Sequence, residues 1–168
     1  MATIVKIKRL TPSAKLPKRD DKEDAAYDCF IDSFAQLDEK GVPKKIESEF
    51  KSIELQPLAR VLCMLGFATA IPSGYYMQVL PRSGNSAKKG ITIHNTPGTI
   101  DSGYRNEWSA ITVNISGEPV KLSIGDKICQ IVLKKIESVE FEEINELPAS
   151  NRGLKGFGSS DEKKKSGN

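Results

Sequence analysis

The sequence predicts an all-β protein, a barrel or sandwich of many short strands. Short runs in which apolar and polar residues alternate recur along the chain, as is typical of half-buried strands. Turn-forming residues such as Pro72-Ser73-Gly74 and Ile124-Gly125-Asp126 separate these runs at close intervals. The chain has 168 residues, enough for one domain that buries roughly two thirds of its unfolded surface. Together these observations favour closed or packed sheets over a helical fold.

The expected elements follow from the alternation and its breaks. Thr3 to Leu10 alternates like a strand, and a charged, proline-broken loop from Pro12 to Asp24 follows it. One short helix is expected at Ser83 to Lys89, and residues 36–57, with their glycine and prolines, are expected to form a surface excursion. Further strands are expected at 27–34, 60–65, 67–71, 75–80, 90–94, 108–115, 119–122, 127–135 and 138–144.

The composition changes near the C-terminal end. From Pro148 onward Ser, Asn, Gly and Lys dominate, and apolar residues become rare apart from Leu154 and Phe157. We therefore expect a β-barrel domain over residues 1–148 and a flexible C-terminal arm over residues 149–168 that is mobile without ligand.

Charge and cysteine content limit the classes of function. The net charge of +3 comes from 25 basic and 22 acidic residues without an aromatic-interleaved basic patch, so no nucleic-acid partner is expected. The longest apolar run, Val61 to Ile71, is too short to span a bilayer, and no membrane association is expected. The three cysteines are expected to be buried free thiols, as in a cytoplasmic or nuclear protein that is not secreted. His94 is the single histidine, so a protein-caged zinc site is not expected.

The stretch from Val79 to Glu107 is the richest in functional signals. Arg82-Ser83-Gly84 combines a guanidinium, a hydroxyl and a glycine backbone, which suits phosphate oxygens but also occurs in ordinary solvated turns. Gly90 to His94 reads as a strand, Asn95-Thr96-Pro97-Gly98 as a turn and Thr99-Ile100-Asp101 as the return strand of a hairpin. Asp101 lies just past this turn, where a carboxylate can be held rigidly, although a plain surface aspartate would fit the hairpin alone.

Five segments, taken in order, resemble the motifs of the trimeric dUTP pyrophosphatase (dUTPase) family. The resemblance spans nearly the whole chain, and five motifs in a fixed order at compatible spacings are far more specific than any one of them. The segments are Ala25-Ala26-Tyr27-Asp28, Pro81-Arg82-Ser83-Gly84-Asn85-Ser86, Asn95 to Arg105, Gly125-Asp126-Lys127-Ile128-Cys129-Gln130-Ile131, and Arg152 to Ser160.

This resemblance implies a fold, an activity and an assembly. The fold is a distorted jelly roll, or β-clip barrel, with a mobile C-terminal arm. The activity is hydrolysis of dUTP to dUMP and pyrophosphate, which limits uracil entry into DNA and supplies dUMP for dTMP synthesis. The implied cofactor is Mg²⁺, and the implied partners are the substrate dUTP and two further copies of the chain, in a homotrimer with shared active sites.

The resemblance also assigns roles to residues. Asp101 is the general base that orients a water for in-line attack on the α-phosphorus, and Asp28 holds Mg²⁺ through its water shell. The alternative for Asp28 is a strand-end carboxylate beside the basic loop. Gln130 supplies a donor near the α-phosphate, although neighbouring backbone could equally satisfy it on its strand. The phosphate contacts are assigned to Arg82, Ser83 and Gly84.

Base and sugar selection are assigned to the predicted hairpin. Backbone groups and the Asn95 amide match the edge of uracil, with Gly98, Thr99 and Ile100 beside them. Tyr104 packs on the deoxyribose, whereas its periodicity alone favours a half-buried strand aromatic. The closing arm contributes Arg152 on the terminal phosphates, Phe157 on the uracil ring, and the backbone of Gly158, Ser159 and Ser160 around the polyphosphate.

Some positions depart from the family pattern, and two rival functions follow from similar folds. Asn106 stands where glycine is common, and Asp161 adds a negative charge near the expected γ-phosphate. A dCTP deaminase would carry a glutamate on the strand after the third motif, where this chain has Ile111. The second rival is a dUTPase-like regulatory protein that binds a partner in a nucleotide-dependent way.

Overall fold

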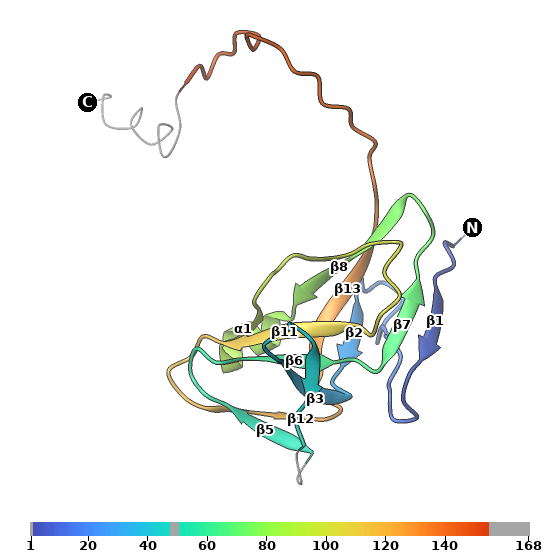
Figure 1. The fold of residues 1–168 in the computed structure, drawn as a ribbon, viewed down its shortest axis with the longest axis vertical. Helices are drawn as coiled ribbons and strands as arrows, with labels where there is room; N and C mark the ends of the chain where they lie inside the picture. The colour runs from blue at the N-terminus through green and yellow to red at the C-terminus, as the bar shows by residue number, and fades with distance from the viewer. Residues whose placement is uncertain (1, 48–50, 155–168) are drawn as a thin grey trace. The chain divides into compact units, whose positions relative to one another are not determined.

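The computed structural model describes residues 2–47 and 51–154, and the regular secondary structure within them consists of β-strands and one short helix (Figure 1). The expectation of an all-β protein with one short helix is confirmed. The strands are β1 (Lys6–Arg9), β2 (Tyr27–Phe30), β3 (Ser33–Leu37), β4 (Pro43–Lys45), β5 (Ser52–Leu55), β6 (Arg60–Met64), β7 (Phe67–Ala70), β8 (Tyr75–Pro81), β9 (Ile91–Ile93), β10 (Gly98–Ile100), β11 (Ser109–Asn114), β12 (Val120–Ser123) and β13 (Lys127–Lys135), and the helix is α1 (Ser83–Lys89).

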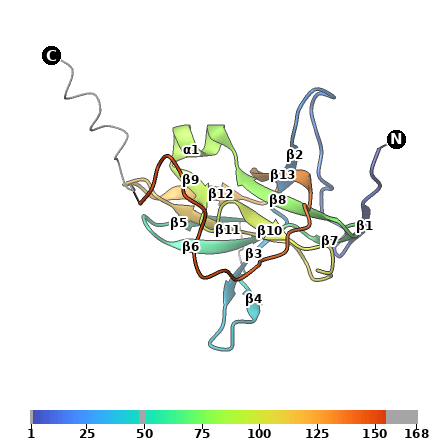
Figure 2. The same ribbon diagram turned by 90° about the horizontal axis from the view of Figure 1, so that it is seen from above.

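Antiparallel pairing organises the strands into two larger and two smaller sheets. The four-stranded sheet has the order β10-β8-β13-β2, and the five-stranded sheet has the order β4-β3-β6-β11-β9. Two-stranded sheets β1-β7 and β12-β5 accompany them, and Figure 2 shows the larger sheets in the view from above. The four-stranded sheet carries five of the residues assigned to chemistry, namely Asp28, Gly98, Thr99, Ile100 and Gln130.

The core forms from the inward-facing side chains of these strands. Trp108 is 1% exposed, and its ring centroid lies 5.3 Å from that of Phe67 at an interplanar angle of 46°. Cys129 and Ile131 are buried on β13 while Gln130 and Val132 are partly exposed, as the pleat of a strand requires. Ile128 is also buried, at an irregularity of the pairing between Lys127 and Cys129. The three cysteines are free and buried, as expected from the sequence.

The chain divides into two units, Met1–Glu137 and Ser138–Asn168, and all thirteen strands from β1 to β13 lie in the first. A strand expected at 138–144 does not form in the structure. Val139 and Phe141 are 68% and 97% exposed, so the alternating pattern there has no partner strand among the described residues. Alternation without a hydrogen-bonded neighbour does not make a strand.

The sequence predicts a surface excursion over residues 36–57, and most of its described residues are exposed. The segment nevertheless contains the end of β3, all of β4, and β5. The pairing corrects one further expectation. The expected hairpin around Asn95 is not a hairpin, because β9 pairs with β11 whereas β10 pairs with β8. The turn therefore carries the chain from one large sheet to the other. The only helix in the described ranges, α1, is not long and apolar enough to cross a membrane.

Candidate active site

A cluster of charged side chains forms where β2, β8 and β13 lie side by side (Figure 1). The Arg82 guanidinium Nε donates to Oδ1 of Asp28 at 2.7 Å, and its Nη2 lies 3.4 Å from Oδ2. The Lys127 Nζ lies 2.8 Å from the same Oδ2. One carboxylate thus holds two cations, which keeps both at the same end of the four-stranded sheet.

Local structure explains why Arg82 reaches this cluster. Arg82 follows the last residue of β8 and is the N-cap residue of α1, with extended backbone angles of φ −97° and ψ 131°. The Asn85 side-chain amide donates to the carbonyl of Lys127 at 2.9 Å, which ties α1 to the start of β13. Ser83 and Gly84 form the exposed first turn of the helix. A Cβ added at Gly84 would meet nothing within 4 Å, so the glycine leaves open backbone beside Arg82.

Gln130 joins the same cluster from β13. It lies directly opposite Asp28 across the β2–β13 pair and opposite Leu80 across the β8–β13 pair. Its Nε2 donates to the carbonyl of Pro81 at 2.9 Å. The Gln130 amide nitrogen is therefore hydrogen-bonded to neighbouring backbone, as the second alternative from the sequence predicts. A substrate would have to share or replace this hydrogen bond.

The second group of assigned residues lies along β10 and the connection that follows it. Gly98 is buried against β8, where an added Cβ would lie 3.3 Å from the Cβ of Val79 and 3.5 Å from Nδ2 of Asn95. The contact with Val79 would be tight, whereas that with the Asn95 amide would be an ordinary van der Waals contact. Thr99 and Ile100 pair with Gln78 and Met77 of β8.

Asp101 and Tyr104 lie in the ordered connection between β10 and β11. The backbone N–H of Tyr104 donates to the carbonyl of Asp101 at 3.1 Å, and the Tyr104 hydroxyl donates to the carbonyl of Glu107 at 3.2 Å. The Asp101 side chain is exposed, and Tyr104 is 40% exposed. The alternative of Tyr104 as a strand aromatic is wrong, because this residue belongs to no strand.

The two groups lie at opposite ends of the same sheet. Ile100 pairs with Met77, and Arg82 lies five residues beyond Met77 along β8. At about 3.3 Å per residue, Arg82 and Ile100 are about 16 Å apart along the strand, and Asp101 continues in the direction away from Arg82. Within one chain, the expected base and the expected phosphate contact do not meet.

Comparison with known proteins identifies the family. The dUTPase family model matches residues 48–161. The deoxyuridine 5′-triphosphate nucleotidohydrolase of Corynebacterium diphtheriae is 34% identical over 158 residues, which cover 94% of this chain and 92% of that protein. The protein of the same name from Fusobacterium nucleatum is 50% identical over 108 residues, covering 64% of this chain and 74% of that protein. The chain belongs to the dUTPase family.

A solved structure supports the same assignment for the fold. A point mutant of the Staphylococcus bacteriophage 80alpha dUTPase, solved with dUpNHpp, superposes with a TM-score of 0.74 at 25% identity. The match covers 95% of this chain and 99% of that one. The all-β fold of this dUTPase is therefore that of a solved family member, and family membership argues against the deaminase alternative.

Parts of the fifth motif fall at the edge of what the structure of this dUTPase describes. Arg152 is exposed and belongs to the unit that begins at Ser138. The remaining assigned residues of the arm, Phe157, Gly158, Ser159 and Ser160, lie outside the described residues.

Two charged residues near the assigned residues of this dUTPase were given no role by the sequence reasoning. Lys127 belongs to the cluster, and its hydrogen bonds to Asp20 and Asp28 raise its pKa. Its position directly after Gly125-Asp126, three residues before Gln130, was the available signal. Glu107 follows Tyr104 closely, and its Oε1 accepts a 2.8 Å hydrogen bond from the backbone N–H of Gly66. Burial raises the pKa of Glu107.

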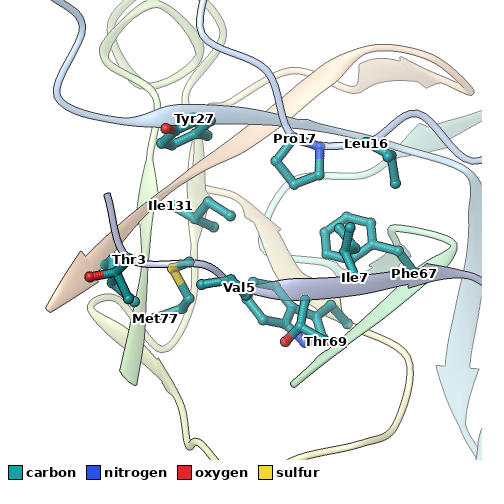
Figure 3. Close-up of a pocket in the computed structure, with 12 residues that line it drawn as sticks. Thr3, Val5, Ile7, Leu16, Pro17, Tyr27, Phe67, Thr69, Met77 and Ile131 are labelled. Atoms are coloured by element: carbon teal, nitrogen blue, oxygen red, sulfur yellow. The ribbon is translucent and has the colours of Figure 1, made fainter. Parts of the chain in front are cut away.

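An apolar pocket of this dUTPase is lined by residues that include direct sequence neighbours of assigned ones, such as Ile131 beside Gln130 (Figure 3). Its lining includes Val5, Tyr27, Phe67, Thr69 and Trp108, and no residue assigned to chemistry contributes to it. The Thr69 hydroxyl and the Trp108 indole nitrogen have no hydrogen-bond partner among the described residues. A lining this apolar does not suit a polyphosphate.

Proposed function

We propose that a water attacks the α-phosphorus of dUTP, at sites shared between the subunits of a homotrimer. This dUTPase hydrolyses dUTP to dUMP and pyrophosphate. The observation that carries the proposal is the separation of Asp101 from the charged cluster on one sheet. Each half of the required chemistry is present, but about 16 Å of strand lies between Ile100 and Arg82. Copies of the chain related by closed symmetry can bring the Asp101 end of one subunit to the Arg82 end of another.

The phosphate-binding half consists of Arg82, Lys127 and Gln130, with the open backbone at Ser83 and Gly84. A planar guanidinium, an ammonium and an amide are donors that suit the oxygens of a polyphosphate. The two cations already lie together beside Asp28, so phosphate binding does not require a search through many side-chain conformers.

The same carboxylate suits a hydrated magnesium ion. No group of three or more His, Cys, Asp or Glu side chains within residues 2–47 and 51–154 is arranged to hold a metal. Magnesium usually keeps several waters and needs one or two carboxylates together with substrate phosphates, so Asp28 fits as the protein's contribution. The bound ion would neutralise charge on the polyphosphate, while Arg82 and Lys127, still beside Asp28, contact the phosphate oxygens.

Asp101 is the base of the second half-site. An ionised carboxylate on an ordered connection can accept a hydrogen bond from water, orient it in line with the scissile bond and take its proton. The adjoining residues choose the nucleoside: backbone groups and the Asn95 amide near Gly98 face the base, and Tyr104 faces the sugar. A base whose edge does not match leaves these polar groups unpaired, which penalises its binding.

The C-terminal arm completes the site as a cover. We infer that residues 149–168 close over bound substrate, with Arg152 on the terminal phosphates and Phe157 on the uracil ring. Such closure excludes water and strengthens the charge interactions beneath it. The buried free thiols are in keeping with a reducing compartment such as the cytoplasm or nucleus.

Product analysis tests this function against both rivals. The protein is incubated with dUTP and the four common deoxynucleoside triphosphates, and pyrophosphate, dUMP and ammonia are measured. We expect pyrophosphate and dUMP in equal amounts, from dUTP alone. Ammonia release would indicate a deaminase. Tight binding of dUpNHpp without turnover of dUTP would indicate the regulatory alternative.

A further inference from the structure

The loop between β1 and β2 places a second carboxylate on Lys127. The Asp20 Oδ2 lies 2.5 Å from the Lys127 Nζ, and the Asp28 Oδ2 lies 2.8 Å from the same nitrogen. The two carboxylates differ in exposure, because the Asp20 side chain is 63% exposed whereas that of Asp28 is 16% exposed. Lys127 is therefore held between an inner carboxylate of the cluster and an outer one at its solvent-facing rim.

The loop is built so that Asp20 lies at this rim. The backbones of Lys18 and Asp28 exchange two hydrogen bonds, of 3.1 and 2.8 Å, which fix the chain two residues before Asp20. On the other side, the Asp24 carboxylate accepts a 3.0 Å hydrogen bond from the backbone N–H of Asp21. The Asp21 carboxylate in turn accepts one from the backbone of Glu23 at 2.8 Å. Asp20 thus lies between two anchored points.

We propose that Asp20 occupies the place of a substrate phosphate on Lys127, and that it lowers the affinity of the enzyme for dUTP by competing with the polyphosphate. The inference rests on the proposed function, because it requires Lys127 to contact the substrate. Two anions that approach the same ammonium repel each other, so the carboxylate and a phosphate cannot both bind it closely without a cost.

The difference in exposure decides which carboxylate leaves. An exposed ion pair contributes little, since water solvates both partners when they separate. A more buried carboxylate that loses its cations pays a larger desolvation penalty. The incoming phosphate therefore displaces Asp20 and leaves Asp28 in the cluster.

The test compares two neighbouring aspartates. Asp20→Asn keeps the shape of the side chain and removes the competing charge, so dUpNHpp should bind about two- to fivefold more tightly by calorimetry at low salt, the range in which exposed ion pairs act. KM for dUTP should fall by a similar factor while kcat stays nearly constant. Asp21→Asn is the matched control. It removes the same charge from the next residue along the chain, whose own side chain contacts the loop backbone. It should bind dUpNHpp like the unmodified protein.

A second background identifies the partner. Lys127→Met should bind dUpNHpp more weakly than the unmodified protein. Adding Asp20→Asn to this variant should not tighten binding if Asp20 acts through the Lys127 ammonium. Three results would each overturn the inference. The affinity for dUpNHpp could be unchanged in Asp20→Asn, or Asp21→Asn could bind it equally tightly. The third such result is that Asp20→Asn still increases the affinity in the Lys127→Met background. These outcomes leave the proposed function intact provided that the unmodified protein still releases pyrophosphate from dUTP. Loss of that reaction would overturn both.

Discussion

Asp101 combines an exposed carboxylate with a backbone tied into the connection between β10 and β11. Its carbonyl accepts the Tyr104 N–H, so the residue is held in place while its side chain meets solvent. This arrangement suits a group that must accept a proton from water without first giving up a structural bond. The charged cluster differs, since every ionised group in it already has an opposite charge beside it.

Asp101→Asn should therefore separate binding from chemistry. The amide is nearly isosteric but cannot take the proton, so turnover of dUTP should fall by at least about 10²-fold. Affinity for dUpNHpp and the midpoint of thermal unfolding should change little, because the side chain is exposed. Steady-state kinetics with calorimetry would measure both quantities. Near-normal turnover in this variant would remove Asp101 from the role of base.

Tyr104→Ala should relax selection of the sugar more than selection of the base. The ring is 40% exposed, and its hydroxyl is tied to the Glu107 carbonyl, so it can form a wall for the deoxyribose. Without this wall, kcat/KM for UTP should rise relative to that for dUTP, while discrimination against dTTP should stay. Tyr104→Phe is the control, since it keeps the ring. An unchanged dUTP-to-UTP ratio in the alanine variant would exclude the proposed role.

Residue types were easier to predict from the sequence than their partners. Asp28 and Arg82 stood out separately, but a pattern read along the chain does not predict an ion pair between residues 54 positions apart. Lys127 was missed because a lysine at the start of an amphipathic strand resembles any solvated residue. For Gln130 the sequence left two alternatives open, a substrate contact and a hydrogen bond to neighbouring backbone. The structure contains the second, to the carbonyl of Pro81.

At the scale of elements, the junction between β6 and β7 supports the connection that carries the site. Gly66 has φ +71°, and an added Cβ would lie 2.7 Å from the Ala14 Cβ and 2.8 Å from the Asp32 Cγ. Its N–H donates to the Glu107 carboxylate. The glycine therefore lets two carboxylates and a second chain segment converge beside the Asp101–Glu107 connection.

Gly66→Ala should destabilise the fold strongly. The left-handed backbone and the crowded Cβ position add their costs, so the free energy of unfolding should fall by about 2 to 5 kcal/mol. Gly117→Ala is the matched control, because a Cβ there meets nothing within 4 Å. It should stay within about 0.5 kcal/mol of the unmodified protein. Urea unfolding would measure both, and equal stabilities of the two variants would contradict the packing seen at Gly66.

Strand positions were largely predictable, whereas their pairing was not. Alternation located β8, β11 and β13 within a residue or two, because the pleat leaves a direct mark on the sequence. The turn at Asn95 to Gly98 was located correctly, but turn residues show where a chain turns and not which strands meet afterwards. Pairing depends on contacts across the whole fold, and the sequence alternation at 138–144 lacked such a partner.

At the scale of the whole molecule, the register of a single sheet motivates the proposed sharing of sites between subunits. Because β10 runs antiparallel to β8, moving from Gly98 toward Asp101 means moving away from Arg82. No rotation of a side chain closes about 16 Å, since even an extended arginine reaches less than half of that distance. If both residues act at the same phosphate, pairing the Asp101 end of one copy with the Arg82 end of another would bring them together.

Mixed oligomers of two inactive chains would test this directly. Asp101→Asn lacks the base and Arg82→Ala lacks the phosphate contact, so each should be nearly inactive alone. In randomly mixed trimers from equal amounts, one site in two has an intact Asp101, and half of these have an intact Arg82 from the neighbour. Refolding the chains together should thus restore about a quarter of the unmodified activity. Native mass spectrometry would verify that the subunits have mixed.

If each site is instead built within one chain, the opposite result is expected for the mixture of Asp101→Asn and Arg82→Ala. Every site would then carry one of the two defects, so mixing would restore nothing, whatever the oligomeric state. A matched control is the mixture of Asp101→Asn with Tyr104→Ala, two changes in the same half-site. If Asp101 and Tyr104 of a site come from one subunit, no site in this mixture has both residues intact. The activity of the mixture should then not exceed the average of the two variants measured alone. Mixed trimers of Asp101→Asn and Arg82→Ala without recovered activity would show that the two ends of the sheet do not cooperate across subunits.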